Sequence, residues 1–170
     1  MIREISLDEP AVSTPKNPGI ELRGVLLPLQ ATSLLLPNVT VVEVIGFREE
    51  DPVENAPGWL RGLVTWNQRR IPVISFEYFV HQEAADAGYR ARIALCHNIT
   101  GDPRLPYIGI LCKSIPRLAR VNDQTVAEVQ FQEIAPQMTL KHIIYNGEDA
   151  WIPDMEKLAD ECAKIVFPVV

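Results

Sequence analysis

Short apolar runs separated by polar turns make up most of the chain. The runs at residues 24–29 and 33–36 predict a β-hairpin, with Pro28 at an edge or at a bulge. Residues 39–45 are rich in β-branched side chains, which predicts a third strand. The polar segment 48–58 contains two prolines and is typical of a surface loop.

The strand pattern continues through the rest of the chain. Residues 63–66 and 71–76 surround the polar segment 67–70, and together they predict another hairpin. The pair Asn146-Gly147 is a strong signal for a two-residue hairpin turn. The remaining predicted strands are residues 90–99, 107–112, 118–121, 140–145 and 150–152.

The hydrophobic pattern changes to a helical period near the C-terminus. Five apolar side chains fall on one face of a predicted helix at residues 154–166, and Asp154 can cap its first turn. A short helical turn is also expected near residues 81–84. The pattern therefore predicts a mainly β chain with a C-terminal helix. The five side chains are Met155, Leu158, Cys162, Ile165 and Val166.

The domain organisation follows from where this periodicity begins. Residues 1–19 show no periodicity and predict a flexible N-terminal arm, whereas residues 20–170 predict a single domain. Many short strands in one chain fit two small β-barrels better than one open sheet, because closure removes exposed edges. We expect the first barrel at roughly 20–88 and the second at roughly 89–153, with an exchange of strands between them left open.

Composition and charge narrow the classes of partner. Hydrophobic residues make up 47% of the chain, which predicts a packed core. The net charge of −6 predicts no nucleic-acid partner, because a phosphate backbone repels an acidic surface. No run is long enough to cross a bilayer and no signal peptide is evident, so we expect no direct membrane insertion. The three cysteines are widely spaced and odd in number, which indicates unpaired thiols in a reducing cytoplasm.

The sequence carries no recognisable pattern for catalysis or metal binding. The histidines share no metal-ligand spacing with the cysteines, and the adjacent Cys96 and His97 would point to opposite faces of a strand. No glycine-rich phosphate loop and no nucleophile elbow occurs. We therefore expect no catalytic residue, no metal and no cofactor. Among the tryptophans, Trp59 follows a polar loop and is the best candidate for partial exposure.

Five short motifs follow one another between Leu36 and Phe76. Together they resemble the CheW family of chemotaxis coupling proteins, in which a proline precedes a V-x-E-V/I strand, an N-x-P loop end, a G-L/V-x-N-L-R-G turn and a P-V/I-V/I-D-L strand. The motifs read Leu36-Pro37, Val41-Val42-Glu43-Val44, Asn55-Ala56-Pro57, Gly62-Leu63-Val64-Thr65-Trp66-Asn67-Gln68 and Pro72-Val73-Ile74-Ser75-Phe76.

The second half of the chain resembles the family more loosely. Residues 107–115 stand where the family has a G-I/L-x-V-D-x-V strand, and residues 147–158 resemble its closing L-x-D-x-x-x-L element and terminal helix. The likeness spans about Gly24 to Leu158 in the family's order. No single motif is specific, and the ordered set carries the resemblance.

The resemblance implies a fold, partners and a binding groove. The fold would be two small SH3/OB-like β-barrel subdomains with a C-terminal helix. The protein would be a non-catalytic cytoplasmic adaptor, recruited to membrane-associated arrays, that couples the cytoplasmic tip of a chemoreceptor to the regulatory domain of a CheA-type histidine kinase. Other CheW-like proteins would be further partners. Carried over by position, the receptor-facing groove residues are Val41, Glu43, Gly62, Asn67, Gly109, Ile115 and Leu118.

Most of these groove residues also have a purely structural interpretation. Val41, Ile115 and Leu118 fit a barrel core equally well. Gly62 and Gly109 fit turn or bulge glycines, because glycine tolerates the backbone conformations found there.

The departures from the family pattern point to a divergent member. The family's Arg-Gly turn is Asn67-Gln68 here, its Asp after the P-V-I run is Ser75, and its later Asp is Lys113. The altered turn and the long polar start resemble accessory CheW-like proteins of type IV pilus (twitching motility) chemosensory systems.

The altered turn also leaves Glu43 without the family arginine. Because an unpaired buried carboxylate is costly, we expect either that Arg69 or Arg70 reaches Glu43 or that Glu43 is solvated.

Two other function classes remain open on the sequence. A small-ligand or nucleic-acid-binding β-barrel protein would show a deep apolar pocket or a basic groove. An enzyme with a dispersed site would show clustered titratable groups with perturbed pKa values in a cleft.

Overall fold

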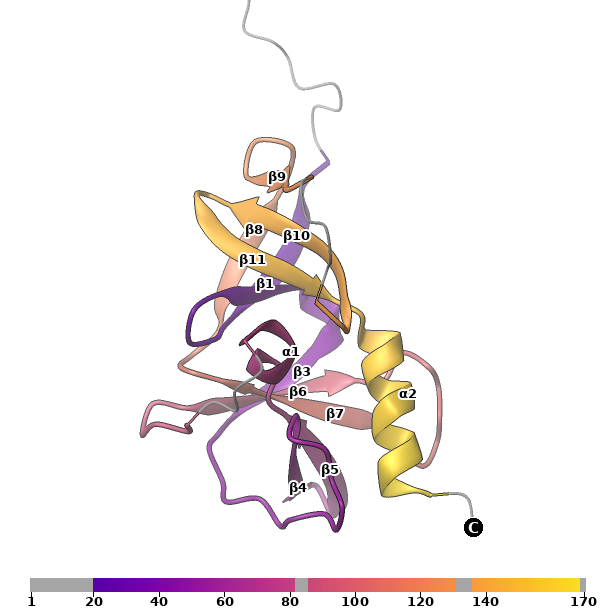
Figure 1. The fold of residues 1–170 in the computed structure, drawn as a ribbon. Coiled ribbons are helices and arrows are strands. Elements are labelled where there is room, and N and C mark those ends of the chain that lie inside the picture. The colour runs from indigo at the N-terminus through magenta and orange to yellow at the C-terminus, as the bar shows by residue number, and fades with distance from the viewer. Residues whose placement is uncertain (1–19, 82–85, 131–135, 169–170) are drawn as a thin grey trace, which may run out of the picture.

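The computed structural model describes residues 20–81, 86–130 and 136–168. Within these residues the chain forms two β-sheets, two α-helices and a short 3-10 helix (Figure 1). The arm expected at residues 1–19 lies outside the described residues, and so do residues 82–84 of the expected helical turn. The mainly β architecture with a C-terminal helix is confirmed.

A six-stranded sheet combines the two ends of the described chain. Its order is β8-β1-β2-β11-β10-β9, and every neighbouring pair is antiparallel except β11 and β2. Its strands are β1 (Leu22–Pro28), β2 (Ser33–Pro37), β8 (Arg117–Val121), β9 (Val126–Glu128), β10 (Thr139–Tyr145) and β11 (Glu148–Pro153).

A five-stranded sheet is built from the middle of the chain. Its order is β3-β6-β7-β5-β4, with one parallel pair between β5 and β7. A 3-10 helix, η1 (Asn38–Thr40), leads from β2 into this sheet. Its strands are β3 (Val41–Gly46), β4 (Leu60–Trp66), β5 (Arg69–Ile74), β6 (Arg92–His97) and β7 (Tyr107–Cys112).

Neither sheet is built from one half of the chain alone, and the expected barrels at 20–88 and 89–153 stay a prediction. The N-terminal hairpin belongs with the C-terminal strands, because β2 pairs in parallel with β11 through Leu34 and Trp151. Both side chains are buried in the main core, so this long-range pairing also buries apolar surface.

The predicted hairpins form, and the β4–β5 turn is shorter than the expected segment 67–70. In the β10–β11 turn, Asn146 and Gly147 have φ values of +44° and +81°. In the β4–β5 turn the tip consists of Asn67 and Gln68 alone, since Trp66 pairs directly with Arg69. Pro28 is the last residue of β1, a strand that lies between β8 and β2 rather than at an edge.

The helices complete the architecture. Helix α2 (Met155–Val166) begins after Asp154, whose Oδ1 accepts a hydrogen bond from the Lys157 amide at 3.0 Å, as predicted. Helix α1 (Glu77–His81) begins earlier than expected. Neither helix, within the described residues, has the length and apolar character needed to span a membrane.

The main core lies between the two sheets and the buried face of α2. Leu34, Phe76, Ile110 and Leu158 are fully buried there. Trp59 is only 8% exposed in the same cluster, so its expected partial exposure is wrong. The tryptophan follows a polar loop but packs against Phe79, with the ring centroids 5.5 Å apart.

Glu77 is a buried carboxyl group of α1 that joins this helix to the β1–β2 turn. Its Oε1 accepts a hydrogen bond at 2.5 Å from the amide of Gln30, in the β1–β2 turn. Burial raises the pKa of Glu77 above its ordinary value of 4.5, and this effect outweighs the opposing hydrogen bond and the charges of His81 and Lys113.

Candidate functional site

The strongest candidate for a partner-binding site lies where the chain crosses from one sheet to the other. The segment 113–116 connects β7 to β8, and the Lys113 amide donates to the Pro28 carbonyl at 2.8 Å. Ile115 and Leu118, both predicted groove residues, are 63% and 81% exposed. Neither side chain is barrel core, so this part of the structural interpretation is wrong.

Two arginines that the sequence analysis did not single out lie beside Ile115. A pocket of about 390 Å³ is lined by Arg90, Arg92, Ser114 and Ile115. The Arg92 guanidinium donates from Nη1 to the carbonyls of Arg90 and Ala91, at 2.9 Å each, which orients it along the chain. We call Arg90, Arg92, Ile115 and Leu118 the junction surface. Arg90 lies in the turn before β6 and Arg92 is the first residue of β6, so strand alternation in the sequence gave no signal that both would line this pocket.

Strand β3 contributes the next two predicted groove residues. Val41 is half-buried against the main core, and Glu43 is exposed. The register of β3 against β6 shifts between these two residues, as in a β-bulge. Because Val41 has core contacts, its structural role is the one supported by the geometry.

Glu43 has no ion pair with any residue in the described part of the chain. Arg70 instead pairs with Asp51, its Nη2 lying 3.2 Å from Oδ2. The expectation that Arg70 reaches Glu43 is therefore wrong, and the solvated alternative agrees with the exposure of Glu43.

Gly62 lies where β4 meets the β3–β4 loop. Its φ is +150°, and the β4–β5 register shifts between Leu60 and Gly62. A Cβ atom at this position would lie 2.4 Å from the Asp51 carbonyl oxygen. Gly62 is thus a bulge glycine required by close backbone approach, which was the structural interpretation of this residue.

The loop that approaches Gly62 is attached to β4 rather than projecting freely. The amides and carbonyls of Asp51 and Leu63 exchange two hydrogen bonds of 2.8 Å each. Arg61 Nε lies 2.7 Å from Glu50 Oε1, and the Glu50 side chain is only 8% exposed. We call this set of contacts the loop clamp.

The other predicted groove residues lie elsewhere in the five-stranded sheet. Asn67 is exposed at the tip of the β4–β5 turn with a φ of +47°. Gly109 is buried in β7, where an added Cβ would lie 2.9 Å from Ile93 Cγ2. β3 and β4 are the two outer strands of this sheet, and Ile45 of β3 and Val64 of β4 belong to one buried cluster. That the seven residues line one groove stays a prediction. Ile115 lies on the crossover and Leu118 at the start of β8, and both are exposed.

The thiols and other titratable groups of the described residues form no reactive cluster. Burial raises the pKa of Cys112 and of Cys162 to about 12, and it raises the pKa of Cys96 as well. In the described ranges no three His, Cys, Asp or Glu side chains are placed to hold a metal ion.

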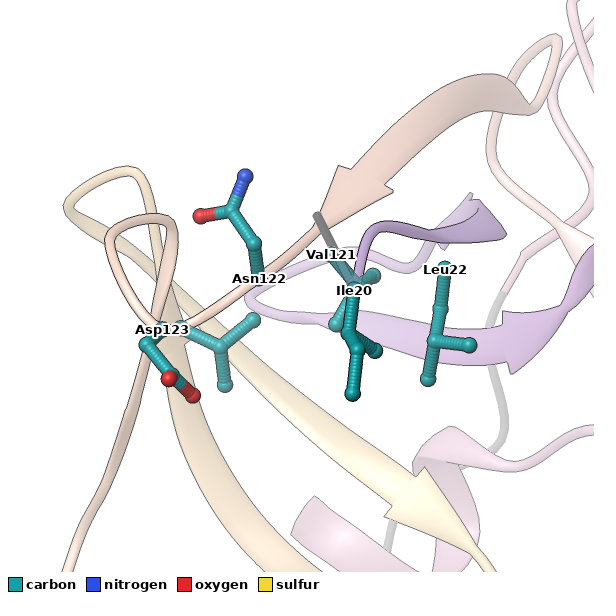
Figure 2. Close-up of a pocket in the computed structure, with 6 residues that line it drawn as sticks. Ile20, Leu22, Val121, Asn122 and Asp123 are labelled. Atoms are coloured by element: carbon teal, nitrogen blue, oxygen red, sulfur yellow. The ribbon is translucent and has the colours of Figure 1, made fainter. Parts of the chain in front are cut away.

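A second surface feature is an apolar groove at one end of the six-stranded sheet. Its larger part has a volume of about 590 Å³ and is lined by residues of four strands and η1, among them Leu22, Gly24, Leu35 and Ile152. A smaller part of about 240 Å³ shares Leu22 and Val121 with it. Figure 2 shows Ile20, Leu22 and Val121 next to one another in the smaller part. We call both parts together the end groove.

Comparison with known proteins identifies the family. A family model described as a CheW-like domain matches residues 20–163. No curated protein matches the chain. Among solved structures, the scaffolding protein TtCheW from Thermoanaerobacter tengcongensis is similar with a TM-score of 0.64, covering 79% of this chain and 84% of that chain at 12% identity. At this identity the structural likeness shows a shared fold, whereas the family match covers both sheets and most of α2. The chain therefore belongs to the CheW-like domain family.

Proposed function

We propose that the protein is a non-catalytic adaptor that couples chemoreceptors to a CheA-type histidine kinase. The observation that carries this proposal is the family match, which spans both sheets rather than one subdomain. The similar solved structure is that of a scaffolding protein, which agrees with this proposal. An adaptor of this kind acts by holding two partners at a fixed spacing, so it needs two binding surfaces and no reactive group.

The junction surface has the chemistry of a protein-binding site. Leu118 and Ile115 are large aliphatic side chains exposed at 81% and 63%, and Arg90 and Arg92 lie beside Ile115. Exposed apolar side chains next to arginines are typical of interface centres, because a partner gains both apolar burial and directed hydrogen bonds. We assign this surface to one of the two partners.

The partners in this proposal are the cytoplasmic tip of a receptor, the regulatory domain of the kinase and other CheW-like proteins. The protein would act in the cytoplasm at membrane-associated receptor arrays. The altered turn at Asn67-Gln68 and the long polar start of the sequence support placing it in a pathway that controls type IV pili. A deletion strain that loses twitching and keeps flagellar swimming would support this placement, and the reverse phenotype would contradict it.

The adaptor proposal is tested by affinity capture from the native host with partner identification by mass spectrometry. Wild-type protein is compared with Leu118→Asp, which changes an exposed side chain of the junction surface. The matched control is Ile99→Asp, because Ile99 is 60% exposed in the β6–β7 connection and is not part of that surface. Urea melts establish that both variants fold.

We expect wild type and Ile99→Asp to capture a chemoreceptor and a CheA-type kinase, and Leu118→Asp to lose one of them. Capture of both partners by all three proteins would refute the junction surface while leaving the adaptor function intact. Capture of neither partner, with a small molecule bound instead, would contradict the adaptor function and favour a ligand-binding β-barrel.

A further inference from the structure

Two arginines face each other across β1 and β8. Arg23 and Arg120 are Cα partners in this antiparallel pair, so their side chains lie on the same side of the sheet. Arg23 is exposed, and the Arg120 side chain is 82% exposed. Like charges directly opposite each other destabilise a strand pair, so this arrangement does not stabilise the fold. A local conflict of this kind indicates a functional role for the two side chains.

Little negative charge lies near this pair among the described residues. Arg120 Nε lies 3.9 Å from Glu21 Oε1, which is a long contact, and Arg23 has no ion pair within the described ranges. In contrast, Arg117 of β8 pairs with Glu148, its Nη2 lying 2.6 Å from Oε2. Because Arg117 and Arg120 are three residues apart, they point to opposite sides of the strand. One side of β8 is thus neutralised, and the other keeps two positive charges in a chain whose net charge is −6.

The Arg23–Arg120 pair continues the junction surface. Leu118 precedes Arg120 by two residues, so both side chains point to the same side of β8, and the intervening Ala119 is buried. The chain from Ile115 to Arg120 spans up to about 17 Å, and the arginines of the junction surface lie beside its first residue. Exposed aliphatic side chains therefore lie between two pairs of arginines along the chain. We call the junction surface together with Arg23 and Arg120 the basic stripe.

The main chain at Arg120 is not free to pair with a strand of another protein. Its amide donates to the Tyr145 hydroxyl at 3.1 Å, and its carbonyl accepts from Thr125 Oγ1 at 2.8 Å. Although β8 is an outer strand of its sheet, these contacts occupy the amide and the carbonyl that an added strand would use. A partner must therefore bind the side chains of the basic stripe, which is the way in which a surface recognises an amphipathic helix.

We propose that the basic stripe binds an acidic amphipathic helix, with Arg23 and Arg120 as the residues that select its carboxylates. A helix of about three turns covers the distance from Ile115 to Arg120 and presents aliphatic side chains on one face, with carboxylates at its margins. Arginine suits this role because its guanidinium remains charged and binds a carboxylate through two hydrogen bonds. That the helix belongs to a partner of an adaptor rests on the proposed function.

The charge of the whole chain favours an acidic protein segment over a nucleic acid. A nucleic acid would meet the same arginines, but its phosphates would extend over the surrounding surface of a chain with a net charge of −6. A short helix places its carboxylates only where the arginines are. Complementary charge of this kind speeds the encounter and rejects basic segments.

Peptide titrations on the full chain test this chemistry without a known partner. Three synthetic helical peptides of about 18 residues, or five turns, carry leucine at the same positions of one face and Glu, Gln or Lys at the flanking positions. In fluorescence anisotropy we expect the Glu peptide to bind at least tenfold more tightly than the Gln peptide, and the Lys peptide to bind least. The net charge of −6 favours the Lys peptide, so a preference for the Glu peptide would locate the binding at the arginines. Equal binding of the three peptides, or tightest binding of the Lys peptide, would overturn the proposal.

Matched variants separate the opposed pair from the charge of the chain as a whole. The test variant is Arg23→Gln/Arg120→Gln. The control is Arg69→Gln/Lys157→Gln, because both side chains are exposed outside the basic stripe and have no ion pair among the described residues. We expect the test variant to bind the Glu peptide at least tenfold more weakly, with an equal or higher urea midpoint, since two like charges are removed. The control should bind the peptide as wild type does, and equal losses in both variants would overturn the proposal.

A third variant determines how far the site extends. Arg90→Gln/Arg92→Gln removes the arginines of the junction surface, and we expect it to weaken binding of the Glu peptide as well. A loss confined to this variant would limit the site to the junction surface and overturn the role of Arg23 and Arg120. Binding of a labelled DNA duplex to wild type, lost in Arg23→Gln/Arg120→Gln, would identify a nucleic-acid site and overturn the proposal too.

Titration of the host's receptor fragment and kinase regulatory domain separates this inference from the adaptor function. We expect Arg23→Gln/Arg120→Gln to weaken binding of one of them at least tenfold and to leave the other unchanged. The same binding should weaken between about 0.1 M and about 1 M salt, as the Debye length falls from about 10 Å to about 3 Å. Binding of both partners by wild type and variant alike would overturn the inference and leave the adaptor function intact. Binding of neither, with the Glu peptide still bound, would contradict the adaptor function and support the chemistry of the basic stripe.

Discussion

Gly62 is the position at which a single added methyl group should disturb the protein most clearly. In Gly62→Ala the new Cβ would lie 2.4 Å from the Asp51 carbonyl oxygen and 2.9 Å from Glu50 Cβ, so the β3–β4 loop must move away from β4. Movement would separate Asp51 from Leu63 and lose their two hydrogen bonds. It would also pull Glu50 away from Arg61, a pair in which the carboxylate is nearly buried.

The magnitude follows from these losses. A φ of +150° is strained for alanine, at about 1–3 kcal/mol, and each lost hydrogen bond costs about 0.5–1.5 kcal/mol. The loop can relax in part, so we expect Gly62→Ala to lower the free energy of unfolding by about 2–4 kcal/mol. The matched control is Gly46→Ala in β3, where an added Cβ has no atom within 4 Å and should change stability by less than about 0.5 kcal/mol.

The assay is urea unfolding at constant pH, combined with amide hydrogen exchange. We expect the Gly62→Ala midpoint to fall by roughly 1–2 M urea, with faster exchange at the Asp51 and Leu63 amides. Equal midpoints for Gly62→Ala and Gly46→Ala would refute the loop clamp. A Gly62 variant that no longer binds a partner would therefore have lost it through displacement of the β3–β4 loop, and not through loss of a direct contact between Gly62 and the partner.

Three further predictions concern single side chains. Because the pKa of Glu77 is raised, the native state binds a proton more tightly than the unfolded state, so the contribution of Glu77 to stability is complete below pH 4.5 and is lost as the pH rises through the native pKa. Urea melts across this range should show that decline in wild type and not in Glu77→Gln. Parallel profiles for the two proteins would contradict the raised pKa of Glu77. Gln68 has a φ of +62° in a two-residue turn, so Gln68→Gly should raise stability by about 0.5–1 kcal/mol in thermal melts, whereas a loss would show that the turn is unstrained. Glu43 is exposed without an ion pair in the described residues, so Glu43→Ala should cost less than about 1 kcal/mol, and a loss of several kcal/mol would indicate a partner that the structure does not contain.

The local elements were predictable because local chemistry determines them. The turn at Asn146-Gly147 needs residues that accept positive φ, and this pair accepts it with little strain. Helix α2 combines a 3.6-residue apolar period with a carboxylate that accepts an amide hydrogen bond at its start. Strand β9, only three residues long, was missed because so short an element carries no periodicity.

The arrangement of the elements could not be predicted in the same way. The parallel pairing of β2 with β11 joins residues more than a hundred positions apart, and no local pattern distinguishes it from a pairing within either half. The burial of Trp59 likewise depends on Phe79, which a separate element brings to it. Such contacts are decided by which apolar faces can be buried together.

The candidate site was predictable only in part for the same reason. Carrying the family's binding positions over to this sequence singled out Ile115 and Leu118, and the exposure of both side chains agrees with a binding role. The same reasoning included Gly62 and Gly109, which the backbone needs for packing. It did not include Arg90 and Arg92, because their position beside Ile115 exists only once the crossover has been folded onto β6.

The most direct test of the central claim is a binding titration between purified components. The full chain is titrated with the regulatory domain of the host's CheA-type kinase and, separately, with a receptor fragment that contains the cytoplasmic tip, using isothermal titration calorimetry. The adaptor function predicts saturable binding to both and a ternary complex when all three are mixed. Binding to neither, by a chain whose urea melt establishes that it is folded, would contradict the adaptor function.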